Sequence, residues 1–519
     1  MERKQYEIEG EKPFGESLIW QLNRDYYDTE GVKAWSSGVV PHHLTSNSMV
    51  GKTYAELIFA FLKDLASKGQ NKEKVYILEL GAGHGRLAFH TLKHLERLTE
   101  QVGLNLPPYC YILSDIVEDN LAFFYTHPQF RPYFEAGLLD LTYFDAVGST
   151  EIYLRHSCTK ILANQLSQPI LVIANYFFDS IPNDLFHFKN RQIGVCSVGL
   201  QTDIRPELLN TETLLKTLKL VYTTTPVAKP FYKKTILNEI LEDYRDLVFN
   251  TYLFFPKTGI QCLQNLQEFS QKGMMLLSID KGHHEIPDLE NGKEPEMAIH
   301  GSMSFSVNYH AIGAYCTKQG GKAYFPKFST FDLQLGCLLF LSESENYTET
   351  QAAYERVVNS YGPDDFNSYK KFVYQHINTM KIPDLIGFLR LSAYDSTVFQ
   401  NILPRIKQLS GAVTFNERKR LAQTMRKTWD MYFTINESTD ISFEIGGIFY
   451  QLGFYEDALV YFGHSRNLFG DTADVFYNKA LCYYQLRKDD LFVKTLKEAK
   501  LHFPSVNFGG LEKLDLGAI

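Results

Sequence analysis

A glycine-rich turn carries the residues whose types and spacing are most suited to chemistry. Glu79 is followed by glycines at alternate positions, Gly81, Gly83 and Gly85, directly after a short apolar run. An apolar run, a glycine turn and a helical pattern in that order are typical of a nucleotide site at the carboxyl edge of an α/β sheet. Glycine is needed where the backbone turns sharply and a ligand approaches it closely. A dinucleotide fingerprint would require another glycine at residue 86, which is Arg86.

Two further acidic residues stand where the next strands are expected to end. Asp115 follows the apolar run Pro108–Leu113, and a carboxylate there can accept hydrogen bonds from both hydroxyls of a ribose. Asp145 ends the run Leu141–Asp145, where it could face an adenine, although taken alone it is better explained as a solvated loop carboxylate. Together with Glu79, the two residues favour a cofactor site over a glycine turn without a ligand.

The elements that must position these residues read as alternating strands and helices, which predicts an α/β fold with a parallel, Rossmann-like sheet. The expected strands are 75–80, 109–114, 141–144, 169–174, 274–280, 322–325 and 336–340. Few single crossovers are as long as the one between the fourth and fifth of these strands, so we expect an insertion at about 183–270. Residues 1–70 are expected to form N-terminal helices, and the whole catalytic domain to span 1–345.

The remainder of the chain reads as helix, with a repeat near its end. Gly446 and Ala480 stand 34 positions apart, and the aromatic residues Phe449 and Tyr483 share that spacing. Small and aromatic residues at this period are typical of tetratricopeptide-like helical hairpins, although an irregular helical bundle remains an alternative. We therefore expect a helical linker region at 346–435 and tetratricopeptide-like repeats at 436–519.

Composition narrows the classes of partner. The formal net charge of −8 over 519 residues gives no electrostatic footprint for non-specific nucleic-acid binding. The N-terminus lacks an apolar signal segment and no apolar run reaches the length of a membrane span, so we expect a cytoplasmic protein without a membrane partner. The seven cysteines are scattered, and the adjacent His42 and His43 have no carboxylate or cysteine at ligand spacing, so no metal site is expected.

Several local motifs together resemble those of one enzyme family. The Glu-x-Gly-x-Gly-x-Gly order is similar to the first motif of class I S-adenosylmethionine-dependent methyltransferases. Residues from about 14 to 340 further resemble the MidA family of these enzymes, which includes a mitochondrial factor for respiratory complex I that methylates a protein arginine. The matching segments are Tyr54–Leu57, Ala174–Pro182, Leu276–His283 and Ser306–Tyr309. The repeat tail is not explained by this resemblance.

The resemblance implies S-adenosylmethionine as cofactor, with Glu79 near the methionine ammonium and Gly81 and Gly83 beneath the cofactor. Gly85, Asp115 and Asp145 complete the expected cofactor set. The residues expected to line the acceptor pocket at the end of the fourth strand are Asn175, Tyr176 and Asp179.

Two departures from the family pattern put arginine in doubt as the acceptor. Tyr176 replaces a glutamate and Asn308 replaces an aspartate, although Glu56, Asp179 and Asp280 could substitute for the missing carboxylates. We expect methyl transfer to a nitrogen of a protein that the repeats recruit. The alternative is a non-catalytic assembly or binding factor that keeps the fold.

Overall fold

The chain divides into two compact units, residues 1–368 and residues 369–519. The structure is a computed structural model, and it describes residues 5–31, 33–36, 44–227, 230–290, 292–328, 333–435 and 437–512. The loop with His42 and His43 lies outside the described residues. Among the described residues, no helix combines the length and the apolar character needed to cross a bilayer.

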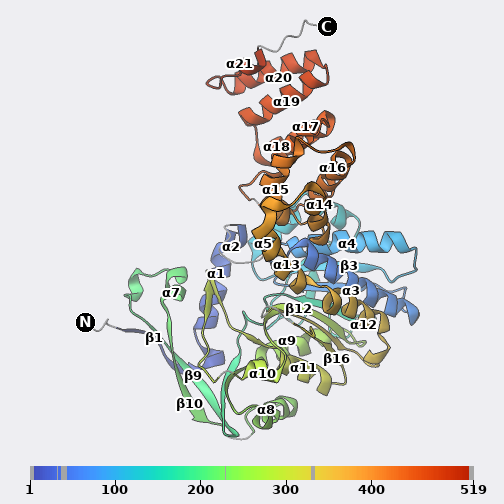
Figure 1. Ribbon diagram of the computed structural model, residues 1–519. Helices are drawn as coiled ribbons and strands as arrows, with labels where there is room; N and C mark the ends of the chain where they lie inside the picture. The colour runs from blue at the N-terminus through green and yellow to red at the C-terminus, as the bar shows by residue number, and fades with distance from the viewer. Residues whose placement is uncertain are drawn as a thin grey trace. The chain divides into compact units, whose positions relative to one another are not determined.

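In the described residues an eight-stranded mixed sheet forms the centre of the first unit (Figure 1). Its strands, from one edge to the other, are β4 (Leu139–Tyr143), β3 (Tyr109–Asp115), β2 (Val75–Leu80), β7 (Ile170–Ala174), β12 (Met274–His283), β17 (Leu333–Phe340) and β16 (Lys322–Tyr324). The first five are parallel, whereas β17 runs antiparallel to both β12 and β16. The short β15 (Val307–Asn308) also pairs with β12. The unit therefore has the mixed α/β architecture that the alternation of strands and helices predicts, with antiparallel strands at one edge of the sheet.

The strand order reverses between β2 and β7. From β2 the chain adds β3 and β4 on one side and then returns to place β7 on the other side. Ligands of open α/β sheets bind in the crevice at the carboxyl ends of the strands at such a switch point. Residues that follow β2 and β7 are therefore the ones that the topology brings to a binding crevice.

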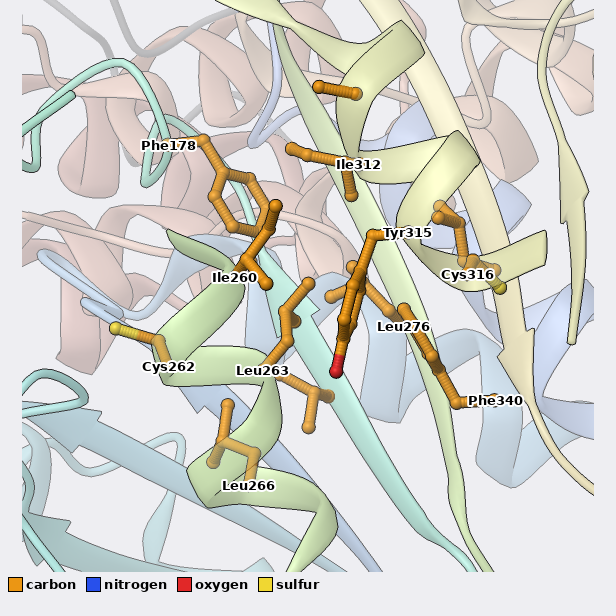
Figure 2. Packing of buried hydrophobic residues seen from close by; sticks show 14 of the residues in the cluster. Phe178, Ile260, Cys262, Leu263, Leu266, Leu276, Ile312, Tyr315, Cys316 and Phe340 are labelled. Carbon is orange, nitrogen blue, oxygen red and sulfur yellow. The ribbon is translucent and has the colours of Figure 1, made fainter. Parts of the chain in front are cut away.

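Helices that bury apolar side chains cover the sheet. On one face, α9 (Lys257–Gln267) and α11 (Tyr309–Lys318) contribute Ile260, Leu263, Ile312 and Tyr315 to a core that includes Leu276 of β12 (Figure 2). Elsewhere α3 (Ser48–Ser67) and α4 (Arg86–Val102) pack so closely that the helices meet without an intervening side chain. A Cβ at Gly51 of α3 would lie 2.4 Å from the Cβ of His90 in α4.

One strand from the N-terminus and four strands of the insertion form a second, antiparallel sheet. It is built from β1 (Tyr6–Pro13), β8 (Asp184–Lys189), β9 (Gln192–Thr202), β10 (Lys219–Pro226) and β11 (Asn250–Phe255). The region 1–70, for which we expected N-terminal helices, contains α1 (Ile19–Glu30), α2 (Lys33–Ser36) and α3 but begins with the strand β1 at Tyr6–Pro13. The only buried side chain of β1 among the described residues is Glu9, and the alternation of apolar and polar residues is confined to residues 6–9, so the pattern is too short to identify the whole strand. Backbone pairing with the long β9 holds β1 in place.

The first unit also extends beyond the expected boundary at residue 345. Helix α12 (Thr348–Tyr354) is fastened to α3 by Asp64, whose carboxylate accepts hydrogen bonds from the backbone N–H groups of Glu349 and Thr350 at 3.0 and 2.8 Å. The Thr350 hydroxyl donates to the same carboxylate at 2.7 Å. The ring of Tyr347 stacks on Phe61 of α3. The division between the units falls later, within α13 (Pro363–His376).

The remaining elements of the first unit are short or lie at its periphery. They are α1 (Ile19–Glu30), α2 (Lys33–Ser36), α5 (Glu118–Thr126), α6 (Arg131–Glu135), β5 (Ile152–Leu154), β6 (Thr159–Ile161), α7 (Thr211–Thr217), α8 (Thr235–Leu247), α10 (Ile286–Leu289), β13 (Ala298–His300) and β14 (Ser302–Ser304). Of these, α1 and the β13–β14 hairpin matter for the site.

The second unit is helical wherever it has regular structure in its described residues. Its helices after α13 are α14 (Ile382–Leu391), α15 (Ser396–Ser410), α16 (Phe415–Asp430), α17 (Ile441–Gln451), α18 (Tyr455–Phe469), α19 (Ala473–Gln485), α20 (Asp489–His502) and α21 (Gly509–Glu512). Helices α17 and α18 form one close pair, and α19 and α20 form another. A Cβ at Gly446 would lie 2.7 Å from the ring of Phe462, so the small residue at this position lets the first pair close. Ala480 is buried at the matching position of the second pair.

Candidate functional site

The glycine turn after β2 has a backbone that only glycine adopts easily. Gly81, Gly83 and Gly85 have φ values of +59°, +60° and +74°, in the left-handed region. The position of a Cβ on Gly81 is open, with nothing within 4 Å. At Gly85 a Cβ would instead meet the ring of Phe130 at 3.0 Å. The first glycine thus borders free space, whereas the last allows α4 to begin against a packed aromatic ring.

A cavity of about 730 Å³ lies at the carboxyl ends of β2, β3 and β7. Its size is within the range of small-molecule and cofactor sites. The cavity is lined by these predicted site residues: Glu79, Gly81, Gly83, Asp115, Asp145, Asn175, Tyr176 and Asp179. Gly85 is the member of the predicted set that does not line it, and its packing against Phe130 gives it a structural role at the start of α4.

Glu79 is a buried carboxyl group at the floor of the cavity. The Tyr111 hydroxyl of β3 donates a hydrogen bond to its Oε2 at 2.8 Å. Burial raises the pKa of Glu79 to about 8, even though this hydrogen bond acts in the opposite direction. A cationic group that enters beside Glu79 would favour its ionised form, so the carboxyl group is suited to receive a ligand cation.

Asp115 ties the end of β3 to the glycine turn. Its Oδ2 accepts a hydrogen bond from the backbone N–H of Gly83 at 2.9 Å, and its Oδ1 accepts one from the N–H of Val117 at 3.0 Å. Burial raises the pKa of this carboxyl group, while both backbone hydrogen bonds lower it. Because each carboxylate oxygen has two lone pairs, Asp115 retains acceptor capacity for hydroxyl groups of a ligand.

Asp145 is held by a cation that the sequence did not indicate. Both terminal nitrogens of Arg24 in α1 donate to Asp145 Oδ2 at 3.1 Å. The other oxygen, Oδ1, accepts a hydrogen bond from the N–H of Val147 at 3.0 Å. Arg24 itself lines the cavity. Asp145 is therefore a half-buried loop carboxylate that forms an ion pair at the cavity wall.

Asn175 is fixed from two sides at the end of β7. Its Oδ1 accepts hydrogen bonds from the Tyr54 hydroxyl at 2.6 Å and from the backbone N–H of Ile279 at 2.9 Å. Its Nδ2 donates to the carbonyl of Thr45 at 3.4 Å. Tyr54 is fully buried in α3, so the orientation of the Asn175 amide is determined by the core beneath it.

Tyr176 occupies a strained backbone position. Its φ is +48°, which is unfavourable for a bulky residue, and its N–H donates to the carbonyl of Ile279 at 3.0 Å. Residues held in such conformations cluster at functional sites. Burial raises the pKa of the Tyr176 hydroxyl, so it stays neutral.

Asp179 lies beside a second carboxyl group. Its backbone N–H donates to Asp280 Oδ2 at 3.1 Å, and the Ser180 hydroxyl donates to Asp179 Oδ1 at 2.7 Å. Both aspartates are buried. Asp179 lines the cavity, and Asp280 lies behind it on β12.

Two residues that the sequence analysis placed near the acceptor have other roles. Glu56 faces away from the cavity and pairs with Arg356 at 3.3 Å. Asn308 caps α11, where its Oδ1 accepts from the N–H of Ala311 at 2.9 Å and its Nδ2 donates to the carbonyl of Phe254 at 3.0 Å. An aspartate at position 308 could not make the second bond. The amide there serves the fold, so it does not count against a cationic acceptor.

Several cavity residues were missed by reasoning from the sequence. They are contributed mainly by α1 and by the β13–β14 hairpin: Trp20, Asn23, Arg24, Tyr27, His300, Ser302 and Met303. The two elements are joined by a hydrogen bond from the Tyr27 hydroxyl to Ser302 Oγ at 2.9 Å and by one from the Met303 N–H to Asn23 Oδ1 at 3.0 Å. No local motif marks these residues, because the sequence separation between the elements is large.

Comparisons with known proteins give distant similarities. No family model matches the sequence, and no curated protein matches it. Two solved structures from Burkholderia thailandensis are weakly similar to this chain. One is an uncharacterised COG1565 superfamily protein, with a TM-score of 0.39, 12% identity, and coverage of 65% of this chain and 90% of that chain. The other is a COG1565 superfamily member in complex with S-adenosyl-homocysteine, with a TM-score of 0.35, 12% identity, and coverage of 68% and 90%. Similarity at this level does not assign the chain to a family.

Proposed function

We propose that the protein is an S-adenosylmethionine-dependent methyltransferase. The observation that carries the proposal is the cavity at the switch point, where a glycine turn lies between two buried acids, Glu79 and Asp115. A ligand with a cationic amine, a ribose and a flat base matches these groups. Gly81 supplies the open backbone over which such a ligand can lie.

Each acidic residue of the predicted cofactor set has a definite task in this proposal. Glu79 receives the ammonium of the methionine part, which compensates the cost of ionising a buried carboxyl group. Asp115 accepts hydrogen bonds from the ribose hydroxyls, and Asp145, oriented by Arg24, lies where the base would be held. S-adenosylmethionine supplies a methyl group that is activated by a positive sulfonium. The chain positions the acceptor in line with that group, which is the main contribution an enzyme makes to such a displacement.

We further propose a protein nitrogen as the acceptor. Asn175, Tyr176 and Asp179 form the wall at the end of β7, where an acceptor side chain would meet the cofactor. Paired helical hairpins, such as α17–α18 and α19–α20, are a common scaffold for binding extended peptides or partner proteins. We assign them to the tetratricopeptide-like class and to recruitment of the acceptor protein.

Calorimetry tests the cofactor assignment. We expect S-adenosylmethionine to bind the wild-type protein and to lose binding in Gly83→Arg, because the new side chain projects from the turn that lines the cavity. Gly137→Arg is the matched control. Gly137 has a similar φ of +67° and an open Cβ position, but it lies outside the cavity. Absence of binding heat from the wild type, or an equal loss of S-adenosylmethionine affinity in both variants, would refute the assignment.

A truncated chain tests recruitment by the repeats. Deletion of 436–519 removes α17 to α21, and methylated proteins are then compared by mass spectrometry. We expect loss of modification with retained cofactor binding. If the truncated protein modifies the same target at the same rate, recruitment by the repeats is wrong. Cofactor binding without any release of S-adenosylhomocysteine in a lysate of the native source would instead support the non-catalytic alternative.

A further inference from the structure

Asn120 is a buried side chain on the cavity wall whose carboxamide has no partner in the fold. It lies in the first turn of α5, is 1% exposed and lines the cavity. Neither its Oδ1 nor its Nδ2 meets the geometry of a hydrogen bond with any residue that the structure describes. A buried amide without a partner costs free energy, and native proteins rarely leave one unsatisfied. Because Asn120 borders the cavity, a molecule bound there is the partner that its position indicates.

The backbone holds Asn120 one turn beyond the carboxylate that we assign to the ribose. The N–H of Val117 donates to Asp115 Oδ1 at 3.0 Å, and the N–H of Asn120 donates to the carbonyl of Val117 at 3.2 Å. The Oδ1 of Asn120 faces the end of α1, where a Cβ on Gly31 would lie 3.7 Å away. Burial raises the pKa of Asp115, whereas the amide of Asn120 is among the groups that lower it. Only a donor has that effect, so the Nδ2 end of the amide lies on the side of Asp115.

A ribose hydroxyl group uses a donor as well as an acceptor. Its proton goes to one acceptor, and its oxygen keeps two lone pairs that a donor can bind. Ionised Asp115 supplies acceptors alone, and the N–H groups of Gly83 and Val117 are already taken by its own oxygens. The Nδ2 of Asn120 is therefore a donor beside Asp115 that the fold itself does not use.

We propose that Asn120 is a specificity-determining residue for the cofactor, and that its Nδ2 donates to the oxygen of the ribose hydroxyl whose proton Asp115 accepts. The inference rests on the proposed use of S-adenosylmethionine and adds the residue that selects a ribose over a deoxyribose. A ligand without that hydroxyl leaves the amide unpaired in a buried place, and a site of this kind rejects analogues that lack the bonded group. A water molecule in the same position is the alternative, and it predicts no link between Asn120 and the ribose hydroxyls.

Calorimetry with S-adenosylhomocysteine and its 2′-deoxy and 3′-deoxy analogues tests the proposal on the full-length protein. The variant is Asn120→Leu, because leucine keeps the branched outline of asparagine and removes both polar atoms. We expect the wild type to bind one of the two analogues on the order of tenfold more weakly than S-adenosylhomocysteine. In Asn120→Leu the affinity for S-adenosylhomocysteine should fall about 3- to 10-fold, and the preference over that analogue should shrink by the same factor.

Two further variants keep the result interpretable. Asn120→Ala cannot overpack the site and should show the same loss of preference. Asp119→Leu carries the same new side chain in the same turn of α5, but Asp119 is exposed and lies outside the cavity, so this variant should keep the wild-type preference. An unchanged preference over both analogues in Asn120→Leu and Asn120→Ala would overturn the proposal and leave the cofactor assignment intact. Failure of the wild type to bind S-adenosylhomocysteine would instead refute the cofactor assignment, so the two failures are distinguishable.

Discussion

Replacing Tyr111 by phenylalanine tests how the cavity recognises the cofactor. The Tyr111 hydroxyl bonds to Glu79 Oε2 at 2.8 Å, and it favours the ionised carboxylate. The substitution removes one oxygen and leaves the ring, so packing within β3 changes little. Loss of the hydrogen bond should make Glu79 harder to ionise and therefore weaken its attraction for the ammonium of S-adenosylmethionine.

The magnitude follows from the hydrogen bond. A hydrogen bond to a charged group contributes about 1.5–3 kcal/mol, and 1.36 kcal/mol corresponds to about one pKa unit. The pKa of Glu79, raised to about 8 by burial, should therefore rise by roughly one to two further units in Tyr111→Phe. Because binding of the ammonium requires ionised Glu79, the affinity at pH 7 should fall about 10- to 100-fold.

Calorimetry at pH 7 in buffers of different ionisation enthalpy provides the measurement. The wild type should release close to one proton on binding, since Glu79 is mostly protonated in the free protein and ionised in the complex. Tyr109→Phe is the control, because Tyr109 lies on the same strand but its hydroxyl group bonds to Thr99 and not to Glu79. An affinity of Tyr111→Phe within twofold of the wild type, or no proton release by the wild type, would refute the reasoning.

Three other predictions concern stability. Because the pKa of Glu79 is raised to about 8, its contribution to the free energy of unfolding is fully present below about pH 4.5 and is lost as the pH rises towards 8. In urea unfolding the wild type should therefore lose up to about 5 kcal/mol of stability relative to Glu79→Gln over this range, and a difference that does not change with pH would contradict the prediction. Gly446→Ala should destabilise the second unit by about 1–2 kcal/mol because the new methyl group overlaps the ring of Phe462, whereas Gly447→Ala, whose Cβ enters open space, should stabilise it by up to about 1 kcal/mol. Calorimetry measures both melting temperatures, and a higher melting temperature for Gly446→Ala than for Gly447→Ala would contradict the prediction. Asp64→Ala should lower the free energy of unfolding of the first unit by about 2–4 kcal/mol, because the donors of α12 lose their acceptor. An unchanged melting temperature would show that these hydrogen bonds do not hold α12 on α3.

The sequence predicted the features of the site that depend on local order. Glu79 and Asp115 lie at the carboxyl ends of β2 and β3, and Gly81 follows β2 directly. Parallel strands bring such positions to one edge of a sheet. The pairings that complete the site are not local. Arg24 reaches Asp145 across 121 positions, and Asp280 reaches Asp179 across 101, so no periodicity or motif indicates them.

The errors in predicting the fold and the site from the sequence have similar causes. The first strand, β1, buries only Glu9 among its described side chains, and its apolar alternation is confined to residues 6–9. The pairing with β9 is what establishes the strand. Asn308 was interpreted as the loss of an acidic residue. Its side-chain amide instead caps the first turn of α11 and donates a second hydrogen bond that a carboxylate could not donate. A substitution within a motif can thus report on the fold instead of the chemistry.

The attachment of α12 to α3 determines where the chain can be divided for experiments. A protein that ended at residue 345 would lose Tyr347, exposing the buried ring of Phe61, and would leave the Asp64 carboxylate in an apolar surface without its three donors. Loss of activity in such a protein would report unfolding around α3, the helix whose Tyr54 holds Asn175 at the cavity. A protein that retains residues up to 368 keeps these contacts, so the proposed methyl transfer can be measured on it in the absence of the second unit.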